Sequence, residues 1–186
     1  MKNDVGTYGL RVVSVRLAED APIMSGNPVR TPLDAVELIG REMCALDREV
    51  VCILHLMADG TPISCTFASM GAADQSLAHP RELLKAAILS NATGMILIHN
   101  HPSGDVGCSE LDTVLTQRIV DVCDLIEIPL LDSIIVGGNN ANYFSYREGN
   151  VLPLPKRSMI TDYRAVKFKA PGAAELKSWL SGGEKR

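Results

Sequence analysis

The residues best suited to chemistry lie in one stretch, residues 95–112, which reads MILIHNHPSGDVGCSELD. It begins as an apolar run typical of a strand and continues through a Pro-Ser-Gly turn into a helix. Successive side chains of a strand point to opposite faces, so His99 and His101 share a face. Asp112, in the first turn of the helix, could fold back over them. Two imidazoles and a carboxylate would leave a zinc ion one open position for water, which is typical of a catalytic site.

A zinc-activated water also needs a general base that is not itself a metal ligand. Glu49 directly precedes the apolar run at residues 50–57, which would bring it near the histidines if the two strands are neighbours. Glu82 lies in the first turn of a predicted helix, where the helix dipole alone favours a carboxylate. Because Glu82 has this structural explanation, we favour Glu49 as the base.

Ser109 stands three residues before Asp112 and is predicted to be the N-cap of the helix, in a variant of the capping box. On its own, this pair would only start a helix. Because two histidines come directly before it, Asp112 is better interpreted as a ligand. Ser109 is then both a cap and a hydroxyl donor to the oxyanion of a tetrahedral intermediate.

Apolar periodicity divides the rest of the chain into alternating strands and helices. Strands are predicted at residues 8–17, 50–57, 61–69, 95–101, 130–136 and 143–146. Helices are predicted at residues 32–46, 80–91 and 110–126, with a short one at residues 173–180. This alternation predicts an α/β fold in which helices cover a sheet. We expect three parts: an N-terminal strand and link at residues 1–32, a domain at residues 33–150, and a C-terminal tail at residues 151–186.

Composition excludes several classes of protein. The 186 residues are enough for one domain with a tail, and 46% hydrophobic against 4% aromatic residues predicts an aliphatic core. No apolar run is long enough to cross a membrane and the N-terminus lacks a secretion signal, so we expect a cytoplasmic chain with no membrane contact. Five cysteines without a C-x-x-C spacing argue against a disulfide framework or a structural zinc site of cysteines.

Charge is unevenly distributed along the chain. Residues 1–150 carry 10 Lys and Arg against 19 Asp and Glu, whereas residues 151–186 carry 8 against 3. Any contact with nucleic acid is therefore expected in the basic tail. A solvated tail with no partner is an equally good interpretation.

The candidate site residues together resemble the motif of a known family. Glu49, the run His99-Asn-His101-Pro102 and the pattern Ser109-x-x-Asp112 resemble the JAMM motif of the MPN-domain zinc metallopeptidases, the JAB family. The longer strings HNHPSG, LLKAAILSNATGMILI and HPREL resemble one branch, the RadC-like proteins. The resemblance covers about residues 33–150, and its H-x-H-P-x6-S-x-x-D spacing is highly specific.

This resemblance implies a fold, an activity and a role for each residue. The implied fold is a curved mixed β-sheet flanked by helices, the MPN/JAB fold with its cytidine-deaminase-like architecture. The implied site is a zinc ion held by His99, His101 and Asp112, with Glu49 as base and Ser109 as oxyanion donor. Known members cleave peptide or isopeptide bonds, often releasing ubiquitin-like modifiers, so a protein or peptide substrate is expected.

The chain departs from the RadC-like pattern in two places. RadC-like proteins usually carry an N-terminal helix-hairpin-helix region that binds DNA, whereas only residues 1–32 precede the domain here, so we expect that region to be missing. Many relatives have a histidine after the aspartate of the last core strand, where this chain has Asp132-Ser133. A supporting role for that position is therefore in doubt.

Other chemistries fit the residues less well. An HNH nuclease disperses its residues along a ββα unit, and a zinc deaminase needs H-x-E with P-C-x-x-C. A histidine-triad hydrolase needs a third alternating histidine, where this chain has Ser103. Cys108 could be a thiol nucleophile, but a small residue in a tight turn is the simpler interpretation.

Two broader alternatives remain open. The first is a DNA-associated accessory protein of a repair or mobile-element setting, in which the zinc is structural or acts on another substrate. The second is a domain that has kept the fold and lost the activity. The oligomeric state is not predictable from these residues.

Overall fold

The computed structural model describes residues 26–69, 79–138 and 142–156. Within these ranges one mixed sheet has the strand order β2-β1-β3-β4-β5. The strands are β1 (Val50–Leu56), β2 (Pro62–Ser69), β3 (Gly94–Asn100), β4 (Leu130–Val136) and β5 (Tyr143–Ser145). All neighbours pair antiparallel except β3 and β4, which are parallel. Parallel neighbours need a crossover connection, and the helix α4 (Glu110–Leu125) supplies it.

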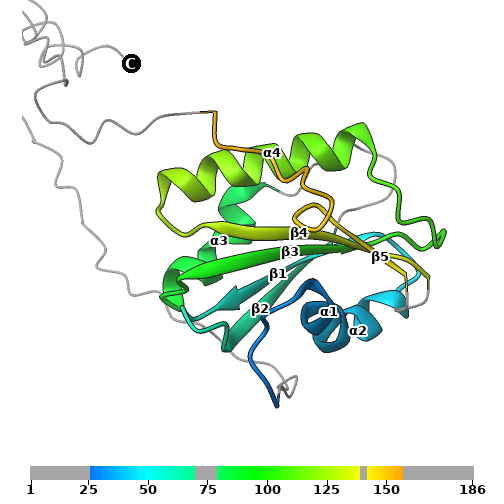
Figure 1. Ribbon diagram of the computed structural model, residues 1–186, viewed down its shortest axis with the longest axis horizontal. Coiled ribbons are helices and arrows are strands. Elements are labelled where there is room, and N and C mark those ends of the chain that lie inside the picture. The colour runs from blue at the N-terminus through cyan, green and yellow to red at the C-terminus, as the bar shows by residue number, and fades with distance from the viewer. Residues whose placement is uncertain (1–25, 70–78, 139–141, 157–186) are drawn as a thin grey trace, which may run out of the picture. The chain divides into compact units, whose positions relative to one another are not determined.

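Helices cover both faces of this sheet (Figure 1). One face, called the α1 face below, packs against three helical segments that follow one another directly: α1 (Pro32–Ala35), the π-helix η1 (Val36–Gly40) and α2 (Arg41–Cys44). The other face, called the α4 face, packs against α3 (Pro80–Leu89) and α4. The domain therefore has three layers.

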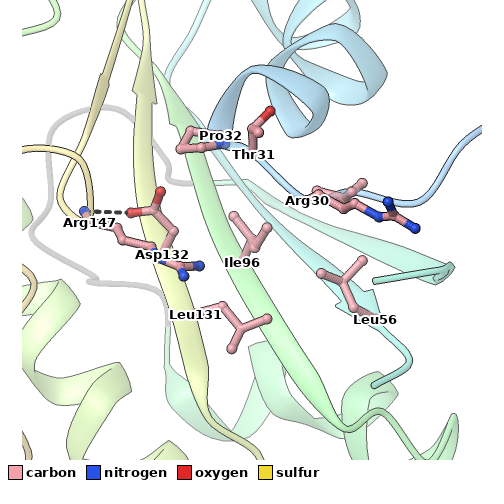
Figure 2. Close-up of a pocket in the computed structure, with 9 residues that line it drawn as sticks. Arg30, Thr31, Pro32, Leu56, Ile96, Leu131, Asp132 and Arg147 are labelled. Atoms are coloured by element: carbon pink, nitrogen blue, oxygen red, sulfur yellow. Dashed lines mark hydrogen bonds between the residues drawn. The ribbon is translucent and has the colours of Figure 1, made fainter. Parts of the chain in front are cut away.

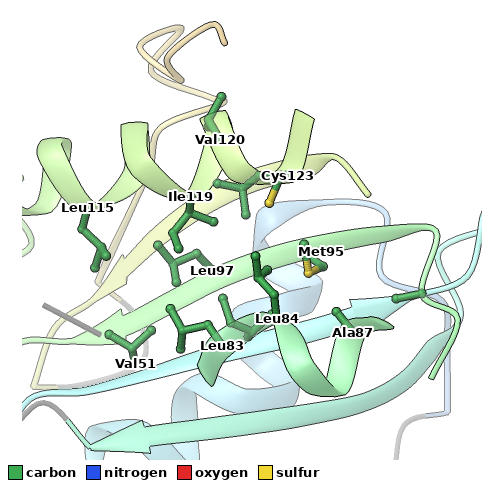
Figure 3. Packing of buried hydrophobic residues seen from close by; sticks show 13 residues of the cluster. Val51, Leu83, Leu84, Ala87, Met95, Leu97, Leu115, Ile119, Val120 and Cys123 are labelled. Atoms are coloured by element: carbon green, nitrogen blue, oxygen red, sulfur yellow. The ribbon is translucent and has the colours of Figure 1, made fainter. Parts of the chain in front are cut away.

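Side chains of the two central strands, β1 and β3, alternate between the two faces of the sheet and so divide the core into two parts. Both β1 and β3 are buried along their whole length, which explains why their sequences are continuous apolar runs. Odd-numbered residues such as Val51 and Leu97 pack on the α4 face (Figure 3), and even-numbered residues such as Leu54 and Ile98 pack on the α1 face. By this alternation His99 belongs to the α4 face.

Within the described residues, the predicted fold class and most predicted elements are confirmed to within a few residues. The predicted helix at residues 110–126 is α4, which ends because Glu127 adopts a positive φ of 58° before Pro129 is reached. The predicted strand at residues 8–17 and the predicted helix at residues 173–180 lie outside the described residues.

The predicted continuous helix at residues 32–46 is the main difference. The chain is helical from Pro32 to Cys44, but its middle turn is a π-helix, and the Leu46 N–H bonds to the Met43 carbonyl in a tighter turn after the helix ends. Apolar spacing sets only an average period, so it cannot distinguish a π turn from an α turn.

The segment that follows β5 continues along α4 beyond residue 150. The Gln117 side-chain amide donates to the Leu154 carbonyl at 3.0 Å, and the Lys156 N–H donates to Asp121 Oδ1 at 2.8 Å. Residues 151–156 therefore contact the domain. In the described part of the chain, no helix combines the length and apolar character that a membrane span requires.

Candidate metal centre

His99 and His101 lie at the C-terminal end of β3, the strand between β1 and β4. His99 is opposite Val51 of β1 on the α4 face. His101 follows the strand, and its N–H donates to the Val136 carbonyl at 2.9 Å, which extends the β3–β4 pairing by one residue. The two ring centroids are 5.0 Å apart, so both imidazoles lie on one face, as strand alternation predicts.

Asp112 approaches both histidines from the first turn of α4. Its Oδ1 lies 3.3 Å from His99 Nε2, and its Oδ2 lies 3.7 Å from His101 Nε2. The three side chains bring one ligand atom each to within 4.8 Å of one another. His99 and Asp112 are buried and His101 is half-buried, so the group lies where the core meets the surface.

A capping box fixes the Asp112 carboxylate. The Ser109 N–H and hydroxyl donate to Asp112 Oδ2 at 2.7 Å and 2.6 Å, and the Asp112 N–H donates to Ser109 Oγ at 3.1 Å. Burial raises the pKa of the Asp112 carboxyl, but the contacts with His99 and Ser109 outweigh it and hold this pKa well below its usual range. Asp112 is therefore ionised at neutral pH, as a metal ligand must be.

A turn after β3 orients His101. Its Nδ1 lies 2.7 Å from the Asp105 carbonyl oxygen, so Nδ1 carries a hydrogen and donates it, which leaves Nε2 on the side of Asp112. The Gly104 N–H closes the turn on the His101 carbonyl at 2.9 Å, with a φ of 84° at Gly104. A Cβ on Gly137 would lie 2.7 Å from the Gly104 carbonyl oxygen, so only glycine permits this approach.

These residues fit a metal ion on three counts. Two imidazole nitrogens and a carboxylate are a ligand set that transition metals take in proteins. Two ligands of one tetrahedral zinc lie roughly 3.3 Å apart, given bonds of about 2.0–2.1 Å, and His99 Nε2 is 3.3 Å from Asp112 Oδ1. His99 Nδ1 is buried without a hydrogen-bond partner among the described residues, and His99 Nε2 has only the approach of Asp112 Oδ1, which is unfavourable unless something binds these nitrogens. The group can therefore hold a metal ion.

A family model described as the RadC-like JAB domain matches residues 29–151, well over half of the sequence. This chain belongs to the RadC-like JAB domain family.

Relatives named UPF0758 protein are 41% identical over 111 residues in Desulforamulus reducens, 37% over 124 residues in Desulfitobacterium hafniense and 38% over 108 residues in Thermotoga maritima. The alignments cover 60%, 67% and 58% of this chain, and 49%, 54% and 48% of those relatives. This chain thus spans about half the length of the curated relatives it matches. Their name states no activity.

The RadC-like JAB domain has Glu49 directly before β1, at the same end of the sheet as His99. The Glu49 side chain is exposed and is not among the three whose ligand atoms converge. Glu82, the rival base, is exposed in α3, where pairing with Lys85 and Arg81 lowers the pKa of its carboxyl. Glu82 therefore has the structural explanation that its position suggests, and the role of Glu49 as base stays a prediction.

Ser109 caps α4, as predicted, through the hydrogen bonds described above. A hydroxyl group has one hydrogen, and here Ser109 donates it to Asp112 because an ionised carboxylate can only accept. Donation to an oxyanion would require this hydroxyl to turn away from Asp112. The oxyanion role of Ser109 therefore stays a prediction.

Two residues that support the site were not among the predicted site residues. Asp105 orients His101 through its backbone carbonyl, which no residue type signals. Asn100 bonds to the chain on both sides of Glu49. A signal existed for Asn100, because an amide in an otherwise apolar strand must find hydrogen-bond partners once it is buried.

The α1 face of the RadC-like JAB domain has a small pocket (Figure 2), and none of the three candidate metal ligands lines it. Its wall includes Asp132, a buried acid whose carboxylate accepts from the Ser145 hydroxyl at 2.6 Å and from the Arg147 N–H at 2.9 Å. The next residue, Ser133, departs from the RadC-like pattern and makes a buried 3.0 Å hydrogen bond to Thr116 of α4. Ser133 thus helps to hold α4 on the sheet.

Proposed function

We propose that this protein is a zinc-dependent metallohydrolase that cleaves an amide bond in a peptide or protein, as a metallopeptidase or isopeptidase. The observation that best supports this is the convergence of His99, His101 and Asp112, whose ligand atoms lie within 4.8 Å of one another. Three protein ligands leave a fourth position on zinc for water, which distinguishes a catalytic site from a closed structural one.

In this proposal, His99, His101 and Asp112 would hold the zinc ion, which would supply the Lewis acidity that makes water nucleophilic near neutral pH. Glu49 would accept a proton from the attacking water and pass it to the leaving amine. Ser109, once its hydroxyl turns from Asp112, donates to the oxyanion that forms on the scissile carbonyl. The Asp105 carbonyl and the Ser109 N–H keep His101 and Asp112 in place throughout.

Iron is the competing metal, because two histidines and one carboxylate also suit Fe(II). Zinc is favoured because amide hydrolysis needs a Lewis acid and no redox change, and because the motif resembles that of zinc peptidases. Elemental analysis of the protein, purified without added metal, should find about one zinc per chain. Iron in place of zinc would remove the zinc assignment.

The sharpest test of the mechanism is Glu49→Gln. The glutamine amide cannot accept a proton, so kcat on a peptide selected from a cleavage library should fall by about 100-fold or more, while zinc content stays unchanged. The matched control is Glu82→Gln, which removes the other candidate acid and should leave kcat within about twofold.

Either of two results would contradict this mechanism. Loss of zinc from Glu49→Gln would make Glu49 a ligand rather than a base. Full activity in Glu49→Gln together with a large loss in Glu82→Gln would transfer the role to Glu82.

Association with DNA is a second candidate function, favoured by the excess of basic residues at 151–186. Because residues 151–156 contact α4, the informative truncation ends at Lys156. Binding of the full chain should weaken steeply with salt, and the truncated chain should not bind. Equal binding by both would exclude the tail, and no binding by either would remove this candidate. Both proposals place the protein in the cytoplasm, which cell fractionation tests.

A further inference from the structure

Asn100 occupies the position between the two histidines but faces the opposite side of the sheet. It is the last residue of β3, and only 1% of it is exposed. Its Oδ1 accepts a hydrogen bond from the Val50 N–H at 2.8 Å, and its Nδ2 donates to the Arg48 carbonyl at 3.0 Å. Both partners belong to the chain entering β1, and they flank Glu49.

The side-chain amide of Asn100 takes the place of a peptide group in the β1–β3 ladder. Backbone pairing between these strands ends at Val51 and His99. One residue further, the amide supplies the acceptor and the donor that a neighbouring strand would otherwise supply. The two partners also fix the amide orientation, because a flipped amide would place its NH₂ group against the Val50 N–H.

This arrangement determines which way Glu49 faces. The β1–β3 register places Val51 opposite His99, and continuing it by two residues places Glu49 opposite His101. Directly opposite residues of antiparallel strands point to the same face. The register continued in this way predicts that the hydrogen bonds at Arg48 and Val50 hold the backbone of Glu49 with its side chain on the α4 face, together with the candidate ligands.

Glu49 itself contributes little to this placement. Its side chain is exposed, and no hydrogen bond or ion pair joins its carboxylate to any other described residue. Glu49 also lies outside the regular part of β1. The backbone bonds to Asn100 are thus the nearest constraint on where the carboxylate can reach.

We propose that Asn100 is a positioning residue that aims the Glu49 carboxylate at the metal centre, an inference that depends on the proposed hydrolytic function. One short segment would then place both parts of the site: His99 and His101 bind the metal on one face, and Asn100 fixes the base from the other. The competing explanation is that Asn100 only stabilises the end of the sheet. The two differ in what happens to kcat.

Two substitutions test this inference. Asn100→Ala removes the amide, and Asn100→Leu removes it while nearly conserving volume, which protects against collapse of the strand end. The control is Ser145→Ala, which deletes another buried hydrogen bond, to Asp132, far from Glu49 in the sheet order. All three variants should lose some stability, but only those at Asn100 should lose turnover.

For both Asn100 variants, we expect kcat on the peptide substrate to fall by roughly 10- to 100-fold with KM within about twofold, because a misplaced base affects the chemical step alone. Zinc content should remain at about one per chain, and Ser145→Ala should retain kcat. Unchanged kcat in both Asn100 variants would overturn the inference, and so would loss of zinc from them.

Amide hydrogen exchange gives a second measurement that needs no activity. In Asn100→Leu, exchange at Val50 should accelerate about tenfold, as loss of one hydrogen bond predicts, while Ile53 in the middle of β1 keeps its protection. Unchanged protection at Val50 would overturn the inference even in an active enzyme. If the wild-type protein hydrolyses no peptide, the proposed function fails, and faster exchange at Val50 would still establish the restraint on Glu49.

Discussion

Among the described residues two aspartates are buried, on opposite faces of the sheet, and their surroundings differ. Asp112 on the α4 face accepts from a backbone N–H and from the Ser109 hydroxyl at 2.6 Å. Asp132 accepts from two backbone N–H groups and from the Ser145 hydroxyl, also at 2.6 Å. Only Asp112 meets imidazoles as well.

Because of that difference, the pKa values of the two carboxyls shift in opposite directions. Burial raises the pKa of the Asp132 carboxyl, and its hydrogen bonds offset this only in part. Burial also raises the pKa of Asp112, but His99 and Ser109 outweigh it and the pKa falls. An acid whose surroundings only satisfy its hydrogen bonds, such as Asp132, is best explained by a structural role. An acid that also converges with other potential metal ligands, such as Asp112, is a candidate for chemistry.

The largest expected effect is on zinc content, measured after Asp112 and Asp132 are each replaced by alanine. Asp112→Ala deletes a proposed ligand. Loss of a group that merely hydrogen-bonds to a ligand already weakens metal affinity by about 10- to 100-fold, so the affinity should fall by at least that much and most of the zinc should be lost on dialysis. Asp132→Ala should retain its full zinc content. Equal metal content in the two variants, measured by elemental analysis, would erase the distinction between the acids.

Replacement of Asp132 should instead lower the stability of the fold. Asp132→Ala leaves the buried Ser145 hydroxyl and Ser133 N–H without their acceptor, which should lower the free energy of unfolding by about 3 kcal/mol. Urea titration measures this. Glu37→Ala on the exposed side of η1 is the control and should stay within about 0.5 kcal/mol of wild type. A change in unfolding free energy below about 0.5 kcal/mol for Asp132→Ala would mean that the hydrogen bonds of Asp132 do not stabilise the fold.

A buried imidazole without a carboxylate extends the comparison. His55 in β1 bonds only to Ser64 Oγ, at 2.9 Å among the described residues, and burial lowers its pKa from 6.5 to about 4. Between these pH values the unfolded chain binds a proton that the folded chain does not. Stability should therefore fall as pH drops from 6.5 to 4, by up to about 1.4 kcal/mol per pH unit.

Replacing the imidazole isolates this effect. His55→Gln should flatten the dependence of the unfolding free energy on pH in that window, whereas His79→Gln, at an exposed histidine, should leave it unchanged. Urea titrations at pH 7, 5.5 and 4.5 give both slopes. Identical slopes in wild type and His55→Gln would show that His55 titrates normally.

The smallest effect should come from the turn that orients His101. Alanine at Gly104 would have to keep a φ of 84°, which should destabilise the fold by about 1–2 kcal/mol. Gly104→Asn should cost less, because asparagine tolerates positive φ. Thermal unfolding compares them, with Gly26→Ala as control, since a Cβ there meets nothing within 4 Å. Equal melting temperatures for Gly104→Ala and wild type would show that the turn adapts.

The sequence was sufficient to predict that His99, His101 and Asp112 converge. Strand alternation places His99 and His101 together, and a helix beginning at Ser109 brings Asp112 back towards them. These are local rules that act over a few residues. The order of the strands, which sets how Glu49 lies relative to β3, depends on long-range pairing that no local pattern encodes.

Three features of the structure could not be predicted from residue types and their spacing. The turn partner of His101 is a backbone carbonyl, so Asp105 carries no side-chain signal. The partners of Asn100 are backbone groups about fifty positions away. The π-helical turn at η1 preserves the apolar spacing of an α-helix, so the pattern alone could not reveal it.

The three candidate metal ligands all fall within residues 99–112, a strand end, a turn and the start of a helix. An ion bound by them closes a short ring of chain, so it restrains little of the unfolded ensemble and acts as a local clasp between β3 and α4. The proposed base comes from a strand far away in sequence. Under the proposed function, binding of the ion and its use for hydrolysis are therefore separable. A substitution at the start of β1 would abolish hydrolysis and leave the ion bound between β3 and α4.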